Sequence, residues 1–230
     1  MNFELCNNNK VYLCGSVASK PSFSHEIYGE KFYDINLEVQ RLSESCDVIP
    51  VTISERLFKD NNLDVGEKIA VKGQFRSYNK LVDGHSKLML TVFVREICEE
   101  MLEGCSNIIE LAGYVCKEPI YRTTPFKREI CDVLLAVNRA YNKSDYLPCI
   151  AWGRNARYVS ELTIGEKVFV TGRIQSREYQ KKIDENTVET RTAFEISISQ
   201  ISTDDNIEKV LDTIPFVQSS TTNSISTQGV

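Results

Sequence analysis

Residues 134–154, with the sequence LLAVNRAYNKSDYLPCIAWGR, read as two β-strands joined by a polar hairpin. Side chains of the second strand alternate between two faces. The apolar face, which can cover a core, consists of Leu147, Cys149 and Ala151. The opposite face consists of Tyr146, Pro148, Ile150 and Trp152. Its two rings are roughly 20 Å apart along the strand. Flat rings spaced along an open sheet are typical of surfaces on which unpaired bases stack.

The chain contains an internal repeat at an offset of 98 or 99 residues. An alternating apolar phrase stands before Pro21 and again before Pro119; its members are Val11, Leu13, Gly15 and Val17, then Ile109, Leu111, Gly113 and Val115. The tripeptide Gly-Glu-Lys also occurs twice, at 66–68 and 165–167. Such register over a whole domain indicates a duplicated fold.

The repeat predicts how the chain is divided. We expect a lead (1–9), a first domain that we call unit 1 (10–98), a linker (99–106), a second domain that we call unit 2 (107–203) and a tail (204–230). The tail is rich in Ser, Thr, Asn and Gln, which cannot bury enough apolar area to offset the entropy of ordering. We therefore expect the tail to be disordered.

Each unit reads as three strands, a short helix and two more strands. The helices are expected at 55–60 and 155–162, and each is followed by a polar turn. In the next strand of unit 2, expected at 166–179, Gly172 stands among alternating apolar residues and indicates a bulge or bend. Five curled strands with one helix between the third and the fourth describe an OB-fold. We therefore predict an all-β protein of two tandem five-stranded OB barrels.

Composition excludes several classes of protein. The net charge is -5, so the chain is not polybasic overall, although residues 104–203 hold 14 Lys and Arg against 12 Asp and Glu. The eight cysteines include no C-x-x-C pair and no zinc-ligand spacing, which favours reduced thiols in the cytoplasm. We find no signal peptide, no membrane span, no phosphate loop and no nucleophile motif. We expect no enzyme activity, cofactor, metal or membrane partner.

Three strings in unit 2 together resemble the bacterial single-stranded DNA-binding proteins: LAVNRAY (135–141), DYLPCIAWGR (145–154) and GRIQSREY (172–179). The resemblance implies that bases stack on four aromatic residues, Tyr141, Tyr146, Trp152 and Tyr179. It also implies that Arg154 and Arg177 lie along the phosphate track. From their charge and place in unit 2 we add four candidates, Arg122, Arg139, Arg157 and Arg173.

Unit 1 departs from this pattern. Ser43, Val48 and Ser54 stand where unit 2 has Tyr141, Tyr146 and Trp152, and Lys80 stands opposite Tyr179. A basic strip with one ring remains on its fourth strand, and it consists of Lys72, Arg76, Tyr78 and Lys80. We expect unit 2 to be the main binding unit and unit 1 to be an auxiliary or assembly module.

The resemblance also implies partners. A chain with two units resembles the variant of the family that forms a homodimer with four barrels. The family's tail ends in acidic residues followed by Ile-Pro-Phe and recruits replication and repair proteins. Here a similar segment contains Asp212, Ile214, Pro215 and Phe216, but fourteen residues follow it. Recruitment through this segment and a plain disordered tail both remain open.

The predicted function is sequence-independent binding of single-stranded DNA in replication, recombination or repair, by a cytoplasmic, nucleoid-associated protein. The alternative is an OB-fold module for protein interaction or assembly, similar to a primosome component, because an OB barrel alone does not fix its ligand. The loss of aromatic residues from the face of unit 1 favours this alternative, whereas the aromatic residues of unit 2 favour binding of DNA.

Overall fold

The computed structural model describes residues 8–59, 63–82, 84–182 and 188–204. The segment that holds Asp212, Ile214, Pro215 and Phe216 and nearly all of the predicted disordered tail lie outside these residues. So does most of the predicted N-terminal lead.

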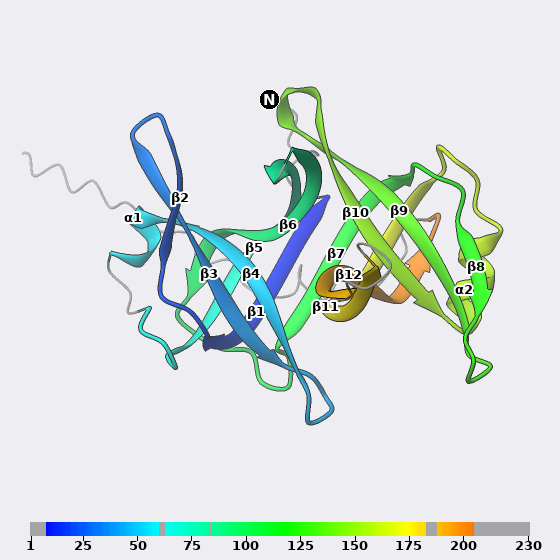
Figure 1. Cartoon of the computed structure of the whole chain (residues 1–230), viewed down its shortest axis with the longest axis horizontal. Coiled ribbons are helices and arrows are strands. Elements are labelled where there is room, and N and C mark those ends of the chain that lie inside the picture. The colour runs from blue at the N-terminus through cyan, green and yellow to red at the C-terminus, as the bar shows by residue number, and fades with distance from the viewer. Residues whose placement is uncertain (1–7, 60–62, 83, 183–187, 205–230) are drawn as a thin grey trace, which may run out of the picture.

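Unit 1 forms a closed barrel of antiparallel and parallel strand pairs (Figure 1). Its elements are β1 (Asn9–Val17), β2 (Ser22–Ile27), β3 (Glu30–Gln40), β4 (Cys46–Ser54), α1 (Glu55–Phe58), β5 (Lys68–Val82) and β6 (His85–Cys98). The strands pair in the order β3-β4-β6-β5-β1, and β1 closes the ring on β3. The β4–β6 pair is parallel and the others are antiparallel.

Unit 2 repeats this path. Its elements are β7 (Asn107–Val115), β8 (Ile120–Thr123), β9 (Glu129–Arg139), a 3-10 turn (Ala140–Asn142), β10 (Lys143–Trp152), α2 (Arg154–Ser160), β11 (Lys167–Lys182) and β12 (Val188–Ser202). The ring runs β9-β10-β12-β11-β7 and closes through β7–β9 pairing. The predicted all-β architecture with one short helix per barrel is confirmed.

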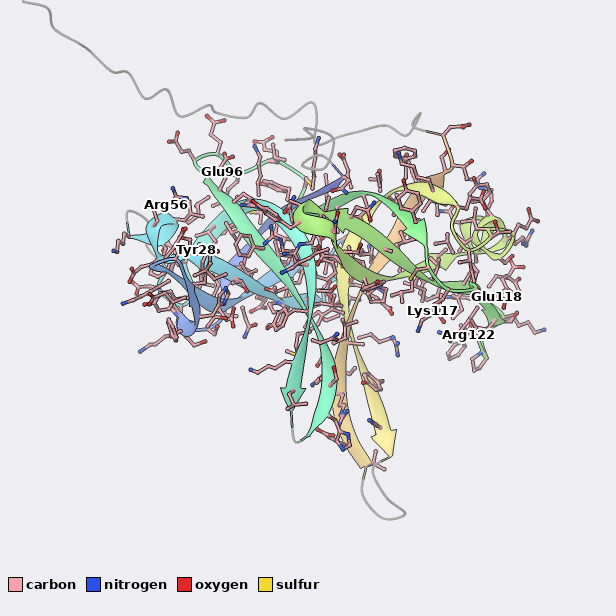
Figure 2. All side chains as sticks on the ribbon, turned by 90° about the horizontal axis from the view of Figure 1, so that it is seen from above. Tyr28, Arg56, Glu96, Lys117, Glu118 and Arg122 are labelled. Atoms are coloured by element: carbon pink, nitrogen blue, oxygen red, sulfur yellow. The ribbon has the colours of Figure 1, made fainter. Side chains whose placement is uncertain are left out.

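Three details differ from the prediction. Each barrel has a sixth, short strand, β2 or β8, that pairs only with the edge of β3 or β9. Both helices are shorter than expected, because α1 ends at Phe58 and α2 ends at Ser160. The last two strands of each unit are longer than the barrel needs, and the β5–β6 and β11–β12 hairpins extend away from the barrels (Figure 2).

A bulge lets each long strand turn the corner of its barrel. Strand register shifts between Thr171 and Gly172 in unit 2 and between Lys72 and Gly73 in unit 1. A Cβ atom on Gly172 would lie 2.3 Å from the carbonyl oxygen of Ser197, so a larger residue does not fit without a backbone shift. The bend predicted at Gly172 is therefore confirmed, and the repeat places a second bend at Gly73.

The two barrels are joined edge to edge through β1 and β7. These strands pair antiparallel, and Val11 lies opposite Ile109, the residue to which the repeat assigns it. On either side, Asn9 faces Leu111 and Leu13 faces Asn107, so the register is symmetric about the Val11–Ile109 pair. An approximate twofold axis through this pair therefore relates the two units, and all twelve strands form one continuous sheet.

The cores lie inside the barrels and follow the predicted alternation. In β10, Leu147, Cys149 and Ala151 are buried, as are the inward residues of β11, Val168, Val170 and Ile174. Seven cysteines in the described part of the chain are free thiols. Among the helices that the structure describes, none combines the length and the hydropathy needed to cross a membrane.

Candidate nucleic-acid interface

Strand β10 presents two rings on the outer face of unit 2. Tyr146 is 47% exposed and Trp152 is 40% exposed, whereas Ile150 between them is buried. Gly153, which follows Trp152, has φ +53, a conformation that glycine adopts without strain. It turns the chain from β10 into α2. The alternation predicted for this strand is confirmed for the two rings, but Ile150, which was predicted on the same face, is buried.

The other two predicted rings lie on hairpins. Tyr141 is 91% exposed at the tip between β9 and β10, where it and Asn142 both have positive φ. Tyr179 lies on the extended part of β11 across from Arg191, and the guanidinium carbon of Arg177 is 5.9 Å from its ring centroid. The structure thus spreads the four rings over β10 and two hairpins.

A pocket of about 390 Å³ opens beside Trp152. Four arginines line it, together with the ring and three polar residues; the lining is Arg41, Arg128, Trp152, Arg173, Gln175, Ser176, Arg177 and Ser197. Trp152, Arg173 and Arg177 were predicted from the sequence, and the structure brings them together. A flat ring beside several guanidinium groups can hold a base and its phosphate in one place.

Arg41 reaches this pocket from unit 1 because Asp47 holds it there. Arg41 Nε donates to Asp47 Oδ2 at 2.8 Å and Nη2 donates to Oδ1 at 2.6 Å. The buried Asp47 carboxylate also accepts from the backbone N–H of Ser176 at 2.6 Å and from its hydroxyl at 2.9 Å. Burial would raise the pKa of Asp47, but the hydrogen bonds from Arg41 and Ser176 outweigh it and the pKa is lowered.

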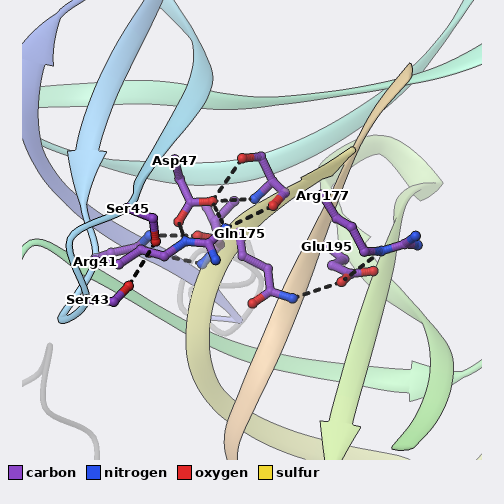
Figure 3. A network of polar contacts seen from close by, with 10 residues as sticks. Arg41, Ser43, Ser45, Asp47, Gln175, Arg177 and Glu195 are labelled. Carbon is purple, nitrogen blue, oxygen red and sulfur yellow. Dashed lines mark hydrogen bonds and ion pairs between the residues drawn. The ribbon is translucent and has the colours of Figure 1, made fainter. Parts of the chain in front are cut away.

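A second group of polar contacts lies in unit 2 beside this junction (Figure 3). Gln175 donates to Glu195 at 2.8 Å, and Arg177 lies 3.6 Å from the same carboxylate. Arg177 is therefore partly neutralised. By contrast, Arg128 and Arg173 form no ion pair with any residue that the structure describes, so their charge remains available to an anion.

The remaining predicted arginines lie outside this pocket, and three of them are paired. Arg122 contacts Asp132 at 2.7 Å, Arg157 contacts Glu129 at 2.7 Å, and Arg139 contacts the buried Asp145 at 3.2 Å. Arg154 is exposed at the start of α2 and pairs with no acid among the described residues. The ion pairs weaken the case for Arg122 and Arg157 as phosphate ligands.

The auxiliary set of unit 1 is divided by its bulge. Lys72 precedes the bulge and lies between Tyr12 and Glu96 on the neighbouring strands. The other three residues, Arg76, Tyr78 and Lys80, follow it on the extended strand, where Tyr78 is 44% exposed. No group of three or more His, Cys, Asp or Glu in the described ranges is arranged to hold a metal ion.

Sequence reasoning missed two arginines of the pocket, Arg41 and Arg128. Arg41 matches Arg139 in the repeat, but only the junction of the units shows that it crosses to unit 2. Arg128 could have been found from hairpin register, because Trp152 pairs with Ile130 and Arg128 is two residues away from that pair. Both signals depend on strand pairing and not on a local motif.

Comparison with known proteins gives one family. The model of the "Single-strand binding protein family" matches residues 106–204. Single-stranded DNA-binding protein 1 of Staphylococcus aureus (strain COL) is 35% identical over 83 residues, which are 33% of this chain and 50% of that protein. The chain thus spans about half the length of the first curated relatives it matches.

Two Thermus proteins align with both units. The single-stranded DNA-binding protein of Thermus thermophilus is 24% identical over 212 residues, covering 80% of this chain and 81% of that protein. The crystal structure of the wild-type single-stranded DNA binding protein from Thermus aquaticus covers 84% of this chain and 91% of its own, with a TM-score of 0.65 and 22% identity. The structural likeness shows that the two chains share a fold.

Proposed function

We propose that the chain binds single-stranded DNA without regard to base sequence, because residues 106–204 match the single-strand binding protein family and both units align with the two Thermus proteins. The observation that carries the proposal is the exposed ring of Trp152 beside the arginine-lined pocket. A tryptophan held at the surface by a buried strand keeps its ring free to stack, and its position costs no further ordering when DNA binds.

Both base stacking and phosphate contacts would contribute to the binding free energy. Each base stacked on an aromatic ring contributes about 1 to 3 kcal/mol and does so for any base, which accounts for the lack of sequence preference. Arg128 and Arg173, which have no ion pair among the described residues, would bind phosphate and release counterions. Duplex DNA is disfavoured because its bases are already stacked on each other.

The predicted site of unit 2 extends from this pocket along the strands. Tyr146 would take a second base on β10, and Tyr141 and Tyr179 would contact nucleotides that leave the barrel along the hairpins. Arg154 and Arg177 would follow the backbone. We further propose that unit 2 is the principal binding unit and that the chain acts where single strands are exposed, in replication, recombination or repair in the cytoplasm.

We also propose that two chains associate, giving four barrels. The approximate twofold axis within one chain supports this proposal, since one chain already has the arrangement of a dimer of barrels. Recruitment of other replication or repair proteins through the segment at 212–216 stays a proposal from the sequence alone.

Replacement of Trp152 tests the function. We expect Trp152→Ala to weaken binding of a fluorescein-labelled oligo-dT of about 35 nucleotides by roughly 5- to 150-fold, the range that 1 to 3 kcal/mol per base gives. Fluorescence anisotropy measures the affinity. Tyr28→Ala is the matched control, because Tyr28 is a fully exposed ring at the far hairpin of unit 1 (Figure 2). Equal affinities for both variants and the wild-type chain would refute the proposed site.

A further inference from the structure

Unit 1 has an aromatic ring on its outer face at a position where unit 2 has none. In unit 2, the β10–β12 pairing places Ser197 beside Ile150, which precedes Trp152 by two residues in β10. Ser197 and Trp152 line the same pocket. The equivalent β4–β6 pairing of unit 1 places Phe93 at the position of Ser197, while Ser54 takes the position of Trp152. The aromatic ring of unit 1 therefore lies on β6, whereas the position equivalent to Trp152 lies on the neighbouring strand β4. An alignment of the two repeats does not pair Phe93 with Trp152.

Two guanidinium groups lie against this ring. The Cζ atom of Arg76 is 4.1 Å from the Phe93 ring centroid, and that of Arg95 is 5.2 Å from it. Phe32 supports the ring from β3 with its centroid 5.4 Å away. Arg95 is exposed, and Phe93 and Arg76 are half-buried. The result is a cation–π cluster with an open side.

Unit 2 adds a third positive charge to this cluster. The backbone N–H of Ser77, next to Arg76 in β5, donates to Asp145 of unit 2 at 2.7 Å, and Arg139 contacts the same carboxylate at 3.2 Å. Burial first, then the nearby charges of Arg139 and Arg95, lower the pKa of Arg76 to about 10. Arg76 stays charged at neutral pH, so Arg76 and Arg139 share one carboxylate, Asp145, and the nearby charge of Arg95 adds to theirs.

We propose that Phe93, Arg76 and Arg95 of unit 1, together with Arg139 of unit 2, form a second nucleotide site for single-stranded DNA. This site rests on the proposed function and extends it to unit 1, which has no aromatic residue at the positions of Tyr141, Tyr146 and Trp152. A base stacks on the exposed guanidinium plane of Arg95, which Phe93 supports from behind. The phosphate binds to the excess positive charge between Arg76 and Arg139.

The two sites mirror each other across the junction. The pocket of unit 2 is completed by Arg41 from unit 1, and the cluster of unit 1 is completed by Arg139, the repeat equivalent of Arg41. Each arginine is held by a buried aspartate that reaches over to the other unit, Asp47 or Asp145. A single strand of DNA of sufficient length can therefore contact both sites, one on each unit of the same chain.

The test compares a short and a long oligonucleotide. An oligo-dT of about 8 nucleotides is of the size that one OB unit covers, and one of about 35 spans two. The variants are Phe93→Ser, which installs the residue that unit 2 has at this position, and Arg95→Ala, which removes an exposed side chain and does not disturb the core. Arg56→Ala is the matched control, because Arg56 has the same charge and is 80% exposed on α1 (Figure 2).

We expect Phe93→Ser and Arg95→Ala each to weaken binding of the long oligonucleotide by about tenfold, the middle of the range for one stacked base. Binding of the short one to unit 2 should change less than twofold, and Arg56→Ala should change neither. If Trp152→Ala weakens the long complex while Phe93→Ser and Arg95→Ala leave it unchanged, the second site is refuted and the proposed function stands. If the wild-type chain binds neither oligonucleotide, the proposed function fails and the second site fails with it.

Discussion

Replacing Asp47 by asparagine should destabilise the fold far more than the same change at Asp145, although the repeat puts the two residues at equivalent positions. Both carboxylates are buried to 1% side-chain exposure and both cross between the units. Asp47 accepts hydrogen bonds on both oxygens. Asp145 Oδ1 accepts one from the backbone N–H of Ser77 and a longer one from Arg139 at 3.2 Å, whereas its Oδ2 atom is buried without a hydrogen-bond partner among the described residues.

The expected magnitudes follow from these contacts. At Asp47, asparagine would present an N–H₂ group to the guanidinium of Arg41 and lose two charge-assisted bonds, each contributing about 1.5 to 3 kcal/mol. Arg41 is 27% exposed and regains some water, so we expect a net loss of about 3 kcal/mol. At Asp145, burial raises the pKa more than Ser77 and Arg139 lower it. Asparagine can keep both bonds to its Oδ1 atom, and the lost attraction to Arg139 and Arg76 is offset by the removal of a poorly solvated charge, so the change should stay within about 1 kcal/mol.

Equilibrium unfolding in urea at pH 7, followed by far-UV circular dichroism, measures both changes. With a slope of about 2 kcal/mol per molar urea, Asp47→Asn should lower the midpoint by roughly 1.5 M and Asp145→Asn by less than about 0.5 M. A double-mutant cycle with Arg41→Ala would assign the loss to the Arg41–Asp47 pair. Equal shifts for the two variants, or a larger shift for Asp145→Asn, would refute this reasoning.

Three further predictions concern pH, the bulges and the arginines. The pKa of Asp47 is depressed in the fold, so its stabilisation is present above about pH 4 and is lost as pH falls further; unfolding midpoints of wild type and Asp47→Asn should converge there. Gly73→Ala and Gly172→Ala, whose Cβ atoms would meet carbonyl oxygens, should each lower Tm by roughly 5 °C in calorimetry, and an unchanged Tm would contradict the bulge geometry. Arg173→Ala should reduce the salt slope of DNA binding by about 0.7, whereas Arg157→Ala, paired with Glu129, should leave it unchanged; the reverse order would contradict the assignment.

Much of the fold could be predicted because each strand buries one face. A period of two in the sequence then fixes which side chains point inward, as it did for Leu147 and Cys149, and the exposure of Tyr146 and Trp152 follows. The repeat predicted two copies of one barrel. Gly172 indicated the bulge because backbone carbonyls leave no room there for a Cβ atom.

The rest depends on contacts between distant segments. Whether an arginine is free or paired is decided by which acid lies across the sheet, so Arg122 and Arg173 look alike in the sequence but differ in the structure. The short edge strands β2 and β8 add no inward-facing core pattern that would reveal them. Phe93 has no aromatic counterpart in unit 2, where Ser197 takes its position, and only strand pairing shows that it lies near the position of the missing tryptophan.

Fluorescence of Trp152, the only tryptophan of the chain, reports directly on whether a base stacks on its ring. The full chain is titrated with an oligo-dT of about 35 nucleotides at low and at high salt. We predict strong quenching with a modest salt slope, since stacking contributes more than the few unpaired arginines. Unchanged fluorescence, with no complex in a mobility-shift assay, would show that the ring only packs against its own sheet and would contradict single-stranded DNA binding through unit 2.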